Sequence, residues 1–155
     1  MKKVFALLSF VLMVSLIFCS CGEAAKPLSD VFASIKEQAG VSELVEFADV
    51  SDLDRFYGIA AEDVADFAGG INNSGVDQEE IVLVKAVDSK AVERIVEVLG
   101  NRLNAKLNET KNYNPEQYAI IEKCYVESDN LYVSLIISAD AQQIREIFKS
   151  AVGIS

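Results

Sequence analysis

Carboxylates are the most abundant side chains in this sequence that could do chemistry. The 155 residues include 24 Asp and Glu against 14 Lys and Arg, and no histidine. Two carboxylates that face each other across a hollow can act as general acid and base, as they do in glycoside hydrolysis. The candidates are Glu62, Asp63, Asp66, Asp77, Glu79 and Glu80. Their spacing is typical of charged turns and helix starts, so solvated or capping roles are favoured over a catalytic pair.

The absence of histidine narrows the possible chemistry further. Ser–His and Cys–His nucleophile pairs and histidine metal sites are excluded. Asp49, Asp52 and Asp54 could offer oxygens to calcium, but the glycine and the distal glutamate of an EF-hand are missing. A helix-capping role is the better interpretation of Asp52. We therefore expect no catalytic residue, no metal site and no cofactor, and the sequence does not indicate which residues would bind a ligand.

Two cysteines follow an apolar run near the N-terminus. Two lysines precede residues 4–18, which are apolar apart from two serines. This pattern is typical of a signal peptide, and it is shorter than the roughly 20 residues that a spanning helix needs. Phe18-Cys19-Ser20-Cys21 then fits a bacterial lipoprotein signal better than a redox or metal pair, which would need a folded, solvated site. We expect Cys21 to carry a diacylglyceryl group and Cys19 to leave with the signal peptide.

This signal divides the chain into three parts. Residues 1–20 are the expected signal peptide, 21–27 a lipidated tether and 28–155 a single α+β domain. Two acyl chains on one residue anchor a protein stably, so the sequence predicts a protein held through Cys21 in the membrane lipid, on the outer face of the cytoplasmic membrane. Cys124 is then a lone thiol, for which burial as a small apolar side chain is favoured over a nucleophilic role.

The part of the chain after the signal peptide is strongly acidic. Loss of residues 1–20 removes two of the 14 Lys and Arg and none of the 24 Asp and Glu, which leaves a formal net charge of −12. This charge argues against a nucleic-acid partner, which needs a basic face. A protein of the cell envelope is the macromolecular partner that the sequence leaves open.

Apolar residues recur at helical and strand spacings along the rest of the chain. Helices are predicted over 28–39, 51–57, 91–107, 115–122 and 141–152, and strands over 64–71, 80–87, 124–127 and 131–138. Residues 42–50 fit either a helix or an extended segment, Gly69-Gly70 indicates a bend or bulge, and Tyr125 and Tyr132 are expected to pair across a hairpin. The main order, α-β-β-α-α-β-β-α, predicts an α+β fold. It would contain a single antiparallel sheet of about four strands, with helices packed on one face.

Three motifs that follow the lipoprotein signal resemble a known family. They are Tyr57-Gly58-Ile59, then Ser74-Gly75-Val76 leading to Glu79-Glu80-Ile81, and then Tyr113-x-Pro115-Glu116-Gln117-Tyr118. In this order they look like a family of small Gram-positive lipoproteins that is catalogued as a domain of unknown function. The resemblance covers residues 44–148. It departs at 65–70, where this chain has Ala-Asp-Phe-Ala-Gly-Gly in place of an apolar strand. The resemblance implies no reaction and no catalytic residue.

These observations favour a membrane-anchored extracytoplasmic lipoprotein whose domain binds or interacts without catalysing a reaction. Two alternatives stay open. One is a carboxylate-based hydrolase of the cell envelope, and the other is a structural lipoprotein of the envelope or of a spore. Two carboxylates facing each other in a hollow would favour the hydrolase.

Overall fold

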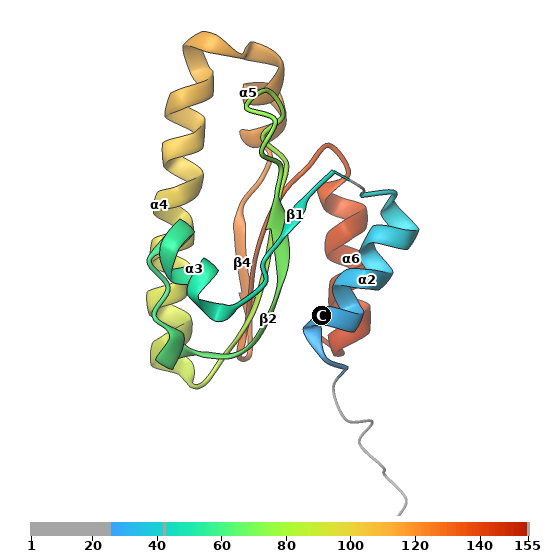
Figure 1. Cartoon of the computed structure of the whole chain (residues 1–155), viewed down its shortest axis with the longest axis vertical. Helices are drawn as coiled ribbons and strands as arrows, with labels where there is room; N and C mark the ends of the chain where they lie inside the picture. Colours follow the sequence, from blue (N-terminus) through green and yellow to red (C-terminus); the bar gives the residue numbers. More distant parts are fainter. Residues whose placement is uncertain (1–25, 42, 155) are drawn as a thin grey trace, which may run out of the picture.

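The computed structural model describes residues 26–41 and 43–154 (Figure 1). The helices are α2 (Leu28–Ala39), α3 (Val50–Tyr57), α4 (Ser89–Tyr113), α5 (Pro115–Ile121) and α6 (Ala141–Val152), with a 3-10 turn at Ala61–Asp63. The strands are β1 (Val45–Glu46), β2 (Val64–Ile71), β3 (Glu80–Ala86), β4 (Val126–Asp129) and β5 (Tyr132–Ile137). The expected signal peptide, Cys21 and most of the tether lie outside the described residues. Within 26–41 and 43–154, no helix combines the length and the apolar character needed to cross a membrane.

The strands form one antiparallel sheet of five strands in the order β1-β2-β3-β5-β4. β3 is central and pairs with β2 on one side and β5 on the other. The predicted strand over 64–71 is present as β2. The ambiguous stretch 42–50 contributes the two-residue edge strand β1, which is the strand beyond the expected four. The α+β class and the single antiparallel sheet are confirmed.

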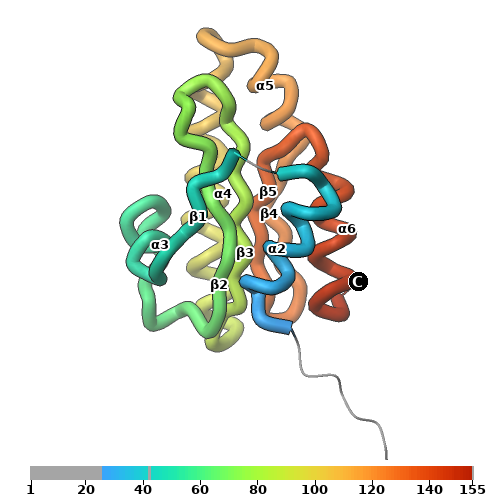
Figure 2. The backbone as a smooth tube through the Cα atoms, turned by 45° about the vertical axis from the view of Figure 1, so that its right-hand side comes forward, coloured from blue at the N-terminus to red at the C-terminus, as the bar shows by residue number. Residues whose placement is uncertain are grey.

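Helices cover both faces of this sheet, and not one face as expected. α2 and α6 lie side by side against one face, and α4 lies against the other with α3 beside it (Figures 1 and 2). The reason lies in the two central strands. Every residue of β5 is buried, and so is every residue of β3 except Lys85. Strands that are almost wholly apolar on both faces require cover on both.

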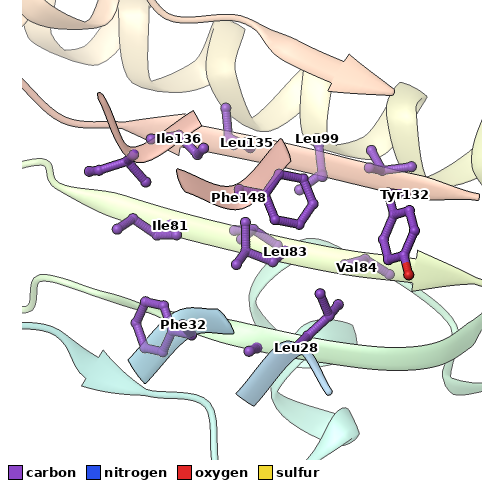
Figure 3. Close-up of a cluster of buried hydrophobic side chains, with 14 of the residues drawn as sticks. Leu28, Phe32, Ile81, Leu83, Val84, Leu99, Tyr132, Leu135, Ile136 and Phe148 are labelled. Carbon is purple, nitrogen blue, oxygen red and sulfur yellow. The ribbon is translucent and has the colours of Figure 1, made fainter. Parts of the chain in front are cut away.

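The core has one layer on each side of β3 (Figure 3). On one side Leu28 and Phe32 of α2 and Phe148 of α6 pack against Leu83, and each of these side chains is at most 2% exposed. On the other side Leu99 of α4 is fully buried. Complete burial of one such side chain contributes about 1.5–3 kcal/mol. These two layers hold the helices against the sheet.

Side-chain caps begin three of the helices. Asp52 accepts from the backbone N–H of Ala48 at 2.8 Å, and it forms a capping box with Asp49 at the start of α3. Asp88 and Asn114 accept backbone N–H groups in the first turns of α4 and α5. The capping interpretation of Asp52, which was preferred to calcium binding, is confirmed.

Candidate functional site

The first three candidate carboxylates do not face one another in a hollow. They are Glu62, Asp63 and Asp66, and each is either exposed or paired with a neighbouring helix. Glu62 is exposed. Asp66 Oδ2 accepts from the N–H of Leu28 at 2.8 Å and so joins β2 to the first turn of α2. Asp63 receives two hydrogen bonds from the guanidinium of Arg94 on α4, one of them from Nε at 2.9 Å. Asp63 and Asp66 therefore tie helices to the sheet.

The Asp63–Arg94 pair predicts a specific response to acid. The hydrogen bonds from Arg94 hold the pKa of Asp63 below its ordinary value. A carboxyl whose pKa is lowered in the folded state stabilises that state above its unfolded pKa, near about 4, and this contribution disappears as pH falls through the folded pKa. We expect Asp63→Asn to lower the urea midpoint at about pH 7 and to lower it much less at about pH 3. An equal loss at both pH values would contradict this prediction.

Glu80 is fully buried beneath α4. Its Oε2 lies 2.9 Å from Arg102 Nη2 and 3.0 Å from Lys106 Nζ, and Lys106 also donates to the carbonyl of Gln78 at 3.3 Å. The hydroxyl of Tyr57 is buried with no hydrogen-bond partner, and burial together with the charge of Glu80 raises the pKa of Tyr57 far above its ordinary value. The charged groups of this cluster form ion pairs with one another. Its role is therefore to hold α3 and α4 to the end of β3.

A larger hollow, named here the cleft, opens between the α5–β4 segment and α6. Its volume is about 580 Å³, within the range of small-molecule pockets. It is lined by Ile120, Lys123, Cys124, Tyr125, Glu127, Ser138, Ala139, Ala141, Gln142, Arg145, Glu146 and Lys149. The lining combines apolar walls with both signs of charge, which is the composition of a binding site with a few orienting groups.

Asp77 and Glu79 are the two sequence candidates that the structure brings to one hollow. This smaller space has a volume of about 130 Å³, and Asp140 also lines it. Glu79 Oε1 accepts from the hydroxyl of Ser138 at 2.6 Å, and Asp77 Oδ1 accepts from the N–H of Glu79 at 2.9 Å. Because Ser138 lines both spaces, the smaller hollow adjoins the cleft.

Arg145 is a buried charge in the wall of the cleft. Its side chain is 9% exposed, and the guanidinium lies 3.9 Å from the centroid of the Tyr125 ring. Its Nε lies 3.3 Å from Glu127 Oε2, so the two side chains form an ion pair. The geometry of this pair does not meet that of a hydrogen bond, and Arg145 Nη2 also has no hydrogen-bond partner. Lys149 donates to the other oxygen of Glu127 at 3.1 Å. The Tyr125 ring and the ion pair with Glu127 therefore hold Arg145 in the wall, with Nε and Nη2 buried.

Cys124 lies in the same wall and is buried, as predicted. Its thiol donates to the carbonyl of Ile120 at 3.4 Å. Burial raises the pKa of the Cys124 thiol, and the backbone of Ser138 and the charge of Arg145 oppose this shift. Because the thiolate is the nucleophilic form, a raised pKa makes Cys124 a poor nucleophile. Its contribution to the cleft is a small apolar surface.

Tyr125 and Tyr132 do not pair across the hairpin as expected. The register of β4 and β5 places Tyr132 opposite Asp129, and the tyrosine ring packs edge-on against Phe148 at 6.1 Å. Tyr125 precedes the first paired residue, Val126, and stacks on Arg145 instead. The tight turn at the hairpin sets this register, and it leaves Tyr125 beyond the ladder and free to form part of the cleft.

Sequence reasoning did not single out Arg145. The apolar stripe of α6 draws attention to Ile144 and Phe148, and Arg145 lies beside that stripe. One signal was available: Arg145 and Lys149 are four residues apart and so share one side of the helix. Which strand lies opposite that side depends on packing, and the structure shows that it is the strand bearing Glu127.

The fold and the cleft together define an α+β domain with a five-stranded antiparallel sheet between two layers of helices and a charged hollow beside α6. The chain belongs to the family described as Domain of unknown function (DUF4358), whose model matches residues 37–138. No curated protein and no solved structure matches the chain. The matched segment includes Tyr125 and Glu127 and ends before α6, so Arg145 lies beyond it.

Proposed function

We propose that this protein is an extracytoplasmic lipoprotein, anchored through acylated Cys21, whose domain binds a ligand or envelope partner in the cleft without catalysing a reaction. The observation that carries the binding part is the cleft itself, a hollow of about 580 Å³ whose lining includes the charged side chains of Lys123, Arg145 and Lys149. Ligand sites in proteins combine such a hollow with a small number of fixed polar groups.

The lipoprotein signal at residues 18–21 supports the anchoring part of the proposal. Because α2 begins at Leu28, residues 22–26 would separate the acylated cysteine from Pro27 by at most about 22 Å. The first described residues lie at the lower end of Figure 1, whereas α5 and the start of α6 lie toward the opposite end. An anchor at the lower end would leave the cleft open to the envelope.

Replacement of Cys21 tests the anchor directly. We expect labelled palmitate fed to cells to appear on the wild-type protein and to be absent from Cys21→Ala, because only the cysteine at the processing site is acylated. The matched control is Cys19→Ala, which should retain the label. Label that persists in Cys21→Ala and disappears in Cys19→Ala would overturn the assignment of the lipid to Cys21.

Crosslinking in intact cells tests the binding part. A photoreactive residue at Gln142, an exposed position that lines the cleft, is expected to capture a specific ligand or partner. The same residue at Glu97, which is exposed on α4 on the opposite side of the sheet, should not capture it. Identical products from the two positions, or no product from Gln142, would count against a binding role for the cleft.

The envelope hydrolase remains a second candidate because of Asp77 and Glu79, which share the hollow of about 130 Å³ beside the cleft. Such an enzyme would use one of these carboxylates as a general acid or base. Hydrolysis of envelope glycans or peptides that is lost in Glu79→Gln would favour this candidate over a binding domain. No turnover by the wild-type protein would favour the binding domain.

A further inference from the structure

We propose that the outer edge of β4 binds an extended peptide segment of an envelope partner, which adds to the sheet as a further strand and places alternate side chains in the cleft. This inference rests on the proposed binding function and names the class of partner. It begins from the strand order, β1-β2-β3-β5-β4, in which β4 pairs with β5 alone. Within the described part of the chain, no strand lies beyond β4.

The hydrogen bonds around β5 show which way its backbone groups point. The N–H of Ala86, at the end of β3, donates to the carbonyl of Leu131 at 2.7 Å, so the backbone groups of Leu131 face β3. Backbone groups alternate between the two sides of a strand from one residue to the next. Those of Tyr132 and Ser134 therefore face β4.

The same alternation leaves two residues of β4 with outward-facing backbone groups. The two residues of β5 that face β4 are paired with Glu127 and Asp129, which direct their own backbone groups toward β5. The N–H and C=O groups of Val126 and Ser128 therefore point away from the sheet, and Ser128 is exposed. Such an edge is a template for a further strand, and strand addition is a recurring mode of peptide recognition.

The cleft lies beside this edge, on the face of the sheet that α6 covers. Glu127 points toward α6, since its carboxylate oxygens lie 3.1 Å from Lys149 Nζ and 3.3 Å from Arg145 Nε. Tyr125, two residues earlier, also lines the cleft and is 49% exposed. Alternate side chains of a strand point to the same face. Every second side chain of a strand added to β4 would therefore enter the cleft.

The charges of the cleft favour an acidic side chain in the bound segment. The lining carries three cations, Lys123, Arg145 and Lys149, against the carboxylates of Glu127 and Glu146, which leaves an excess of one positive charge. Arg145 and Lys149 both pair with Glu127, whereas Lys123 is exposed. An Asp or Glu of the partner that faces the cleft would offset this excess and fix the register of the added strand.

A second copy of this chain fits the edge poorly. Two β4 strands related by a two-fold axis would pair in antiparallel fashion. The registers that pair residues 126–129 of the two copies place Glu127 opposite its own counterpart or opposite Asp129. Like charges directly opposite each other destabilise a sheet, so the edge favours a different chain.

The first test selects peptides on the full-length protein in detergent from a phage library of random heptapeptides. We expect selected peptides that contain an acidic residue and bind with a Kd of about 100 μM or tighter by isothermal titration calorimetry. Methylation of single backbone nitrogens of such a peptide should weaken binding at least about tenfold at alternate positions and little between them, because every second N–H faces β4. No selected peptide, peptides without an acidic residue, or losses that do not alternate would overturn the proposal.

Ser128→Pro tests the edge on the protein side. Proline is tolerated on edge strands where its missing N–H would face solvent, so this variant should fold. It should weaken peptide binding at least about tenfold, because it removes an outward donor and its ring obstructs the added strand. Ser128→Ala keeps the N–H and is the matched control, which should bind as the wild type does. Equal binding by Ser128→Pro and the wild type would overturn the proposal.

A measurement on the wild-type protein covers the case in which Ser128→Pro fails to fold. Amide hydrogen exchange, followed by NMR, reports on single N–H groups. Those of Val126 and Ser128 should exchange at least about tenfold more slowly when the selected peptide is bound, because they become hydrogen-bonded. Unchanged exchange at both residues would overturn the proposal.

Sedimentation and crosslinking separate this inference from the proposed function. A wild-type dimer that Ser128→Pro disrupts would assign the edge to a second copy and overturn the inference. A product captured from Gln142 in cells that persists in Ser128→Pro would also overturn it, and would leave the binding role of the cleft intact. No product from Gln142 in the wild-type background would instead count against the proposed function itself.

Discussion

Gly69→Ala is expected to lower the free energy of unfolding by more than about 4 kcal/mol, a loss large enough to prevent normal folding. An alanine Cβ at this position would lie 2.0 Å from the carbonyl oxygen of Ile81 on the neighbouring central strand. The backbone of Gly69 also has φ of +145°, which residues with a Cβ rarely adopt. Relief of the clash would separate β2 from β3, and the measurement is urea unfolding followed by circular dichroism.

Gly100→Ala is the matched control for this substitution. Gly100 lies within α4, and a Cβ there would meet nothing within 4 Å. Because alanine favours helix by about 1 kcal/mol over glycine, this variant should be slightly more stable than the wild type. A stable Gly69→Ala protein with a normal unfolding transition would show that the close approach of β2 and β3 at Gly69 is not required.

Glu80→Ala is expected to lower the free energy of unfolding by about 3–5 kcal/mol, because it leaves the charge of Lys106 buried without a counter-ion. Lys106 has a side chain that is only 7% exposed, and its ammonium lies 3.0 Å from Glu80 Oε2. Arg102 is the less affected partner, since a third of its side chain is exposed and it can turn toward water. Urea unfolding at about pH 7 measures the loss.

Two further variants separate the charge effect from the loss of packing. Glu80→Leu combined with Lys106→Met removes both charges of the buried pair, and it should recover most of the stability that Glu80→Ala loses. Glu97→Gln, at an exposed position on α4, should stay within about 0.5 kcal/mol of the wild type. A double variant as unstable as Glu80→Ala would mean that the shape of Glu80, and not its charge, supports the junction of β3 and α4.

The glycine pair shows where local pattern and packing diverge. Gly69-Gly70 indicates a bend or bulge in the sequence, but the register shift of β2 lies between Val64 and Asp66. The glycines instead allow neighbouring strands to approach β2 closely. A Cβ on Gly70 would lie 2.7 Å from the carbonyl oxygen of Val45 in β1. The absence of a side chain can be read from one residue type, but its purpose depends on strands that lie 12 and 25 residues away in the chain.

The sequence by itself determined the α+β class, the single antiparallel sheet and the capping role of Asp52, because these features depend on apolar spacings of about 2 and 3.6 residues and on side chains within one turn. The tertiary structure alone decided which helices cover each face, that Glu80 meets Arg102 at a separation of 22 residues, and that Arg145 meets Tyr125 and Glu127. Such pairings depend on which faces of distant elements pack together, and no local spacing records that choice.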